Sequence, residues 1–145
     1  MHFGWINCIN MTVIAYLILI NVITAKKGLS DSFSSKHLIV NILEQIGRYG
    51  SMVFMIFPIF IKNWEFGFKT VAEMFIWLFL TVLLLLIYTV LWFQKAGSSA
   101  GISYGLAIIP TVLFLLNGIL LQHSALIIVS LIFGIFHMGV VRENV

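Results

Sequence analysis

Charged residues are scarce in this chain, and their scarcity indicates its class. Only 9% of the 145 residues are Asp, Glu, Lys or Arg, whereas about 25% of a soluble domain is charged. The chain therefore has too little polar surface to shield a hydrophobic core from water. Apolar residues make up 61% of it and the mean hydropathy is +1.12. This composition is typical of a protein that lies in a lipid bilayer. We therefore expect the bilayer to be a partner of the chain.

Cysteines and catalytic motifs are also missing. The single cysteine, Cys8, excludes a disulfide within the chain. The sequence contains no CxxC, HExxH, GxSxG or P-loop pattern, so we assign no catalytic residue. No two of the four histidines lie three or four residues apart, which excludes a two-histidine chelate within one helix, and we expect no metal or other cofactor. No basic cluster exceeds the pair Lys26–Lys27, so nucleic acid is not an expected partner.

Long apolar runs are what the sequence does contain. A transmembrane helix needs about 20 mostly apolar residues, and the runs of suitable length lie at about 5–24, 38–61, 71–93, 102–121 and 125–141. Residues 78–91 show no alternation of polar and apolar side chains, which excludes the strands of a membrane barrel. We therefore predict an all-α fold, with residues 1–145 forming one transmembrane domain of five helices.

Basic residues between the runs predict the orientation of this bundle. Five passes place five basic residues on one side of the membrane: Lys26, Lys27, Lys36, Lys95 and Arg142. Only Lys62 and Lys69 fall on the other side. Because cytoplasmic loops carry the excess of Lys and Arg, we expect the N-terminus outside and the C-terminus in the cytoplasm.

A polar stripe interrupts the second apolar run. Asn41, Glu44, Gln45 and Arg48 lie at positions i, i+3, i+4 and i+7, which is one face of a helix, and Tyr49 adjoins them. The apolar stretch after the stripe is too short to cross a bilayer alone, so a spanning helix must include it. Each charge at the bilayer centre costs about 2.5–3.5 kcal/mol. These five residues are the candidate intramembrane polar site.

Three interpretations of the stripe remain open. Ionisable residues inside a membrane often face a cavity and mark the path of a substrate or ion. Alternatively, Glu44 and Arg48 neutralise each other, being spaced i, i+4 with the acid first, and pack this helix against asparagines of the first helix. In the third interpretation residues 36–49 lie partly among the lipid headgroups, with Arg48 extending toward them.

Several other polar or small residues interrupt the apolar runs. An amide without a partner is unfavourable in hydrocarbon, so we expect the amides and one histidine to contact other helices. These residues are Asn7, Asn10, Asn21, Asn117 and His137. Gly47 and Gly50 thin the second helix so that another backbone can approach, and Pro58 is expected to kink its far end.

Two segments of the chain resemble a known group of proteins. The run N-I-L-E-Q-I-G-R-Y-G at residues 41–50 resembles a segment of small uncharacterised multi-pass membrane proteins of Gram-positive bacteria. The stretch from Ile109-Pro110 to His137 resembles the same group, with its Ile-Pro followed by a short helical hairpin. The resemblance implies a multi-pass protein of the bacterial plasma membrane and supplies no activity.

A weaker similarity is to the small membrane-bound glutathione-dependent transferases. These enzymes carry an N-x-x-E pattern on their second helix, as Asn41 and Glu44 do here. The present chain departs from them, because Lys36 and His37 replace the usual arginine-rich approach and five helices are expected.

The sequence thus leaves three functions. A small transporter or channel-like protein, or a subunit of one, is slightly favoured, with the stripe facing the cytoplasm. The alternative is a non-catalytic accessory or structural subunit that binds a protein or lipid. The third is a glutathione-transferase-like membrane enzyme. A chain of 145 residues can barely enclose a path by itself, so we expect a homo-oligomer or a membrane protein partner.

Overall fold

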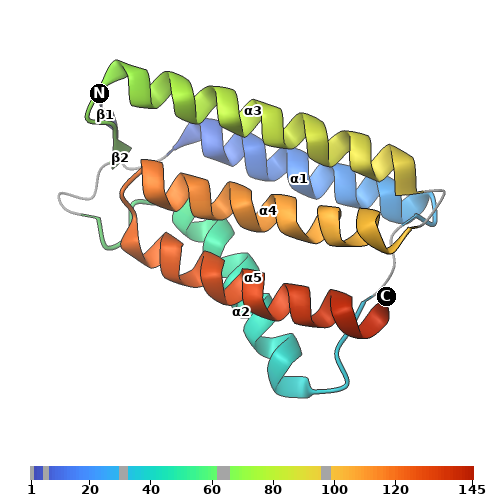
Figure 1. Cartoon of the computed structure of the whole chain (residues 1–145). Coiled ribbons are helices and arrows are strands. Elements are labelled where there is room, and N and C mark those ends of the chain that lie inside the picture. Colours follow the sequence, from blue (N-terminus) through green and yellow to red (C-terminus); the bar gives the residue numbers. More distant parts are fainter. Residues whose placement is uncertain (1, 5–6, 30–32, 62–65, 96–98) are drawn as a thin grey trace.

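Five α-helices make up most of the described chain in the computed structural model (Figure 1). The structure describes residues 2–4, 7–29, 33–61, 66–95 and 99–145. The helices are α1 (Cys8–Lys26), α2 (Leu38–Ile56), α3 (Val71–Gln94), α4 (Ala100–Leu120) and α5 (Ser124–Asn144). Two short strands, β1 (His2–Gly4) and β2 (Phe66–Gly67), pair antiparallel. The prediction of a helical fold with five helices is confirmed.

Local capping determines where several helices begin. The side chain of Asn7 accepts a hydrogen bond from the backbone N–H of Asn10 at 3.0 Å. Thr70 caps α3 and Ser99 caps α4 in the same way. Each cap satisfies a backbone donor that the first turn of a helix leaves without a partner. The bounds of α1, α3, α4 and α5 consequently lie within three residues of the expected ones.

The end of α2 differs from the expectation. We expected a helix to residue 61 with a kink at Pro58, but α2 ends at Ile56. Phe57 is already extended, with φ −114° and ψ 134°. The physical reason is that proline disfavours the helical conformation in the residue before it and has no N–H to continue the helical ladder. Pro58 therefore terminates the helix, and the expectation of a kink was wrong.

The chain runs up and down through the bundle. β1 precedes α1 and β2 precedes α3, so their pairing, with His2 opposite Gly67, places the starts of α1 and α3 at one end. The backbone N–H of Asn7 also donates to the carbonyl of Ile56 at 2.9 Å, which brings the end of α2 to the same place. Figure 1 shows α2 crossing α5 at an angle while its first half diverges from α1.

Four helices are long and apolar enough to cross a membrane: α1, α3, α4 and α5. Their outer faces carry large exposed apolar side chains such as Phe79 (67%) and Ile135 (69%), as lipid-facing surfaces do. This composition indicates a multi-pass membrane protein. α2 has 19 residues but is not among the four; its polar stripe lowers its hydropathy.

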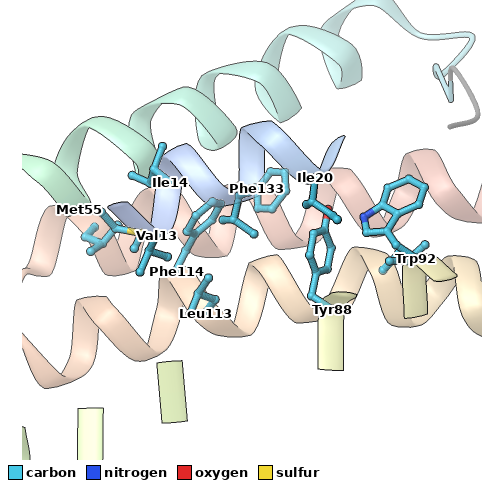
Figure 2. Packing of buried hydrophobic residues seen from close by; sticks show 12 residues of the cluster. Val13, Ile14, Ile20, Met55, Tyr88, Trp92, Leu113, Phe114 and Phe133 are labelled. Atoms are coloured by element: carbon cyan, nitrogen blue, oxygen red, sulfur yellow. The ribbon is translucent and has the colours of Figure 1, made fainter. Parts of the chain in front are cut away.

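The buried apolar side chains form one main cluster between the helices (Figure 2). Met55, Leu113 and Phe114 are almost completely buried. In Figure 2, Tyr88 and Trp92 lie at the opposite end of this cluster from Met55. The cluster therefore extends from the last turn of α2 to the second half of α3.

The four asparagines that were expected to contact other helices each bond to one. The Asn10 amide donates to the carbonyl of Met55 at 3.0 Å, and Asn7 is bonded to α2 through its backbone. Asn21 accepts from the Tyr88 hydroxyl at 2.9 Å, and Asn117 accepts from Trp77 Nε1 at 2.7 Å. The first two asparagines thus join α1 to the last turn of α2, far along that helix from its charged residues.

Candidate functional site

Three ionisable side chains from α2 and α5 meet inside the bundle. Glu44 is only 4% exposed. Its Oε1 accepts a hydrogen bond from Arg48 Nη2, one turn further along α2. His137 Nδ1, on α5, lies 3.0 Å from the same oxygen. We call Glu44, Arg48 and His137 the Glu44 cluster.

Gly47 lets α2 and α5 approach closely enough for this cluster to form. A Cβ atom added to Gly47 would lie 2.6 Å from the backbone nitrogen and 2.7 Å from the Cα of Phe133 on α5. The backbones of α2 and α5 therefore touch at this point, where a side chain does not fit. One turn away along each helix, Glu44 and His137 come within contact distance. At Gly50 an added Cβ would lie 3.5 Å from the Val129 side chain, which is an ordinary contact.

The Phe133 ring supports two members of the cluster. It stacks on the imidazole of His137 with centroids 4.7 Å apart and an interplanar angle of 17°. The guanidinium carbon of Arg48 lies 5.8 Å from the centroid of the same ring. Stacking and cation–π attraction restrict the orientation of both side chains. The cluster is thus held on a rigid, largely buried surface.

A cavity of about 580 Å³ adjoins the Glu44 cluster and is lined by all five helices. Its size is in the usual range of small-molecule sites. The polar lining residues are Asn21, Glu44, Gln45, Arg48, Tyr49, Tyr88, Trp92, Lys95, Ser103 and His137. The cavity combines these groups with apolar walls, which is the composition of a ligand site.

The cavity is open along one side. Its α1 edge includes Ile18 and Val22, which are 49% and 45% exposed, and its α2 edge includes Tyr49, which is 61% exposed. α1 and α2 diverge along this part of the bundle (Figure 1). The opening therefore lies between α1 and α2, on the outer surface of the bundle.

Lys95 supplies a second cation to the cavity. The residue is 7% exposed, and its ammonium lies 5.1 Å from the Trp92 ring centroid and 5.2 Å from that of Phe33. In the sequence, Lys95 was only one of the basic loop residues that predict the orientation of the bundle in the membrane. Tyr88, Trp92 and Ser103 were likewise missed as lining residues, because only the folded bundle brings α3 and α4 to the same cavity as α2.

Four of the five residues of the candidate site line the cavity: Glu44, Gln45, Arg48 and Tyr49. Asn41 is not among the lining residues. Its amide nitrogen donates to the Ser35 carbonyl at 2.9 Å, and its amide oxygen accepts from the Ser35 N–H at 2.8 Å. Asn41 therefore fixes the loop before α2.

The helix that packs against Glu44 and Arg48 is not the one that the second interpretation of the stripe expected. Glu44 and Arg48 are paired with each other, as the i, i+4 spacing predicts. The helix that contacts the pair is α5, through His137 and Phe133, and not the asparagine face of α1. Among the residues that the structure describes, no three of His, Cys, Asp and Glu are grouped so as to hold a metal ion.

Fold and site together define a multi-pass helical membrane protein with an ionisable cluster beside an internal cavity. Comparisons with protein-family models, with curated proteins and with solved structures found no match to this chain. The function is therefore inferred from the cavity itself.

Proposed function

We propose that the chain crosses a bacterial plasma membrane five times, with its N-terminus outside and its C-terminus in the cytoplasm. The paired strands support five spans, because α1 and α3 begin at one end of the bundle. Two helices that both cross in the same direction require a return pass between them, and α2 takes that place in the chain. The excess of Lys and Arg at the end where α2 begins supports a cytoplasmic assignment of that end.

Within this arrangement the protein is a small transporter or channel-like protein, or a subunit of one. The observation that carries the proposal is that the Glu44 cluster lines a cavity of about 580 Å³ inside an otherwise apolar bundle. Charges inside a membrane are costly to place, and in transport proteins they bind substrates or ions. The protein is expected to act as a homo-oligomer or with a membrane protein partner.

One observation favours a second candidate, an accessory subunit that binds a protein or lipid. Glu44 contacts both Arg48 and His137, so the cluster also suits a purely structural contact between α2 and α5. The third candidate, a glutathione-transferase-like enzyme, requires Asn41 and Glu44 to act together. The bonds from Asn41 to Ser35 disfavour that pairing.

A flux experiment separates these functions. Liposomes containing the purified protein are incubated with a small-molecule extract of bacterial cells, and their lumen is analysed by mass spectrometry. We expect a class of compounds to accumulate that does not accumulate in empty liposomes. Glu44→Gln is expected to abolish most of this accumulation because it removes the buried charge. Glu73→Gln, which removes a carboxylate in the first turn of α3 outside the cavity, serves as the matched control.

The other outcomes identify the alternatives. If no compound accumulates above empty liposomes and Glu44→Gln changes only the size of the assembly in gel filtration, transport is excluded and the accessory function is supported. Conjugation of glutathione to an electrophile by the purified protein would instead support the enzyme.

A further inference from the structure

His137 contacts a carboxylate with one ring nitrogen and keeps access to the cavity. Its Nδ1 lies 3.0 Å from Glu44 Oε1. The carboxylate favours a hydrogen on Nδ1, because the contact of one ring nitrogen determines the tautomer of the ring. In the neutral ring the lone pair is therefore on Nε2. The His137 side chain is 18% exposed and lines the cavity, so Nε2 can receive a proton from water there.

The other titratable groups of the cavity come from α2 and from the end of α3. Within the part of the chain that the structure describes, α1 and α4 contribute no charged or titratable side chain to the lining. The charged or titratable lining residues are Glu44, Arg48, Tyr49, Tyr88, Lys95 and His137. Histidine is the side chain that ordinarily changes its charge between about pH 5 and 8. His137 is therefore the lining residue whose charge we expect to respond to physiological pH.

A proton on Nε2 changes the charge of the Glu44 cluster. Glu44 is an anion and Arg48 a cation, so their charges cancel while the imidazole is neutral. The imidazolium raises the charge of the cluster by one, whatever the partners of the other lining residues. A ligand with a negative charge is then bound more tightly. Because coupling between two binding sites is reciprocal, such a ligand also strengthens the binding of the proton.

The cavity has donors for the acidic group of such a ligand and apolar walls for its body. Arg48 bonds to Glu44 through Nη2, but a guanidinium has five N–H donors and the Arg48 side chain is 34% exposed. α4 contributes Leu106, Pro110 and Phe114 to the walls. The volume of about 580 Å³ suits a small molecule. The lining therefore fits a small organic anion with an apolar body.

We propose that the cavity binds a small organic anion together with one proton, which His137 takes up at Nε2. The acidic group of the ligand contacts Arg48, and the new N–H bond forms with a proton that the water of the cavity carries. The proposal rests on the proposed function and names the substrate class and the coupled ion of the same cavity.

Calorimetric titration with benzenesulfonate tests this proposal on the full chain in nanodiscs, with empty nanodiscs as the blank. The probe has an apolar ring, and its sulfonate stays ionised at neutral pH, so a change of affinity with pH comes from the protein. Repeating the titration in buffers with different heats of ionisation gives the number of protons taken up with each ligand. We expect uptake of up to one proton and an affinity about tenfold higher at low than at high pH within the titration range of histidine, a typical coupling between two sites. The neutral benzenesulfonamide should cause no proton uptake.

Two histidine substitutions provide a matched pair for the same experiment. His137→Gln removes the group that takes up the proton, so benzenesulfonate should bind without proton uptake and with an affinity that no longer depends on pH. His37 is exposed, precedes α2 and lies outside the cavity lining, so His37→Gln should behave like the unchanged protein. NMR of the unchanged chain with labelled histidine needs no variant at position 137. At a fixed pH, benzenesulfonate should shift one histidine signal toward the imidazolium form, and that signal should persist in His37→Gln.

Three results would overturn the proposal. These are binding of benzenesulfonate without proton uptake, equal proton uptake with benzenesulfonamide, or proton uptake that persists in His137→Gln. If benzenesulfonate does not bind but liposomes containing the protein still accumulate other compounds, the proposed transport function stands and only the coupled anion is wrong. If benzenesulfonate does not bind and no compound accumulates in the liposomes, both proposals fail.

Discussion

Replacing Gly47 with alanine is expected to destabilise the protein by about 3 kcal/mol, near the upper end for overpacking in a core. The added Cβ would lie 2.6 Å from the backbone nitrogen of Phe133, and no side-chain rotation relieves a contact with backbone. The better helix propensity of alanine offsets at most about 1 kcal/mol of this loss. Unfolding in mixed micelles by increasing SDS, followed by circular dichroism, measures the difference.

Gly50→Ala is the matched control, because it is the same substitution in the same helix. Here the new Cβ meets only the Val129 side chain at 3.5 Å. We expect stability to be unchanged or to increase by up to about 1 kcal/mol, since alanine favours the helix. Equal losses at the two positions, or no loss at Gly47, would contradict the close approach of α2 and α5.

Removing Arg48 is expected to produce the second large effect. Arg48→Met leaves Glu44, 4% exposed, without its cationic neighbour on α2. Breaking a fully buried pair typically costs 3–5 kcal/mol. The Arg48 side chain is 34% exposed and His137 remains beside Glu44, so we expect a smaller loss of about 2 kcal/mol. The same SDS titration measures it.

A double variant tests whether the loss arises from the stranded charge. Glu44→Gln combined with Arg48→Met removes both charges, so it should be more stable than Arg48→Met alone. Additive losses from the two substitutions would instead mean that Glu44 and Arg48 contribute independently. In that case the ion pair seen between them has no energetic role.

Hydrophobic runs were sufficient to predict the helices of this protein. Five apolar runs became five helices, because each must satisfy its own backbone hydrogen bonds and bury one face against its neighbours. The error was the end of α2, where Pro58 stops the helix although the apolar run continues. Hydropathy alone does not detect this, whereas the conformational restriction before a proline does.

The sequence predicted only the residues that α2 contributes to the candidate site. Helical spacing grouped Glu44 with Arg48, and intrahelical geometry then brought them into contact. It also included Asn41, whose amide instead bonds to Ser35 in the preceding loop. A polar contact was expected for His137, but no local pattern identifies Glu44 as its partner, because that contact depends on where α2 crosses α5.

The position of Lys95 could not be predicted from the local sequence either. Lys95 follows the last residue of α3, and its place in the lining of the cavity depends on the packing of α3 against the other helices. The roles of Glu44, Gln45, Arg48 and Tyr49 in binding a substrate stay predictions, as do the bacterial plasma membrane and the orientation.

Thiol accessibility tests the central claim, a water-accessible cavity on the cytoplasmic side of the bundle. Cys8 is exposed, so it is first replaced with serine. Single cysteines are then placed at Glu44, Gln45 and Arg48, and a control is placed at Ile135 on the lipid-facing surface of α5. Vesicles of known orientation are treated from each side with a membrane-impermeant thiol reagent.

We expect cysteines at 44, 45 and 48 to react from the cytoplasmic side only, and the cysteine at 135 to react from neither side. Protection of 44 and 48 from both sides, with reaction of a cysteine at 41, would contradict the cavity. It would mean that the Glu44 cluster is a dry contact between α2 and α5, and that transport does not pass through it.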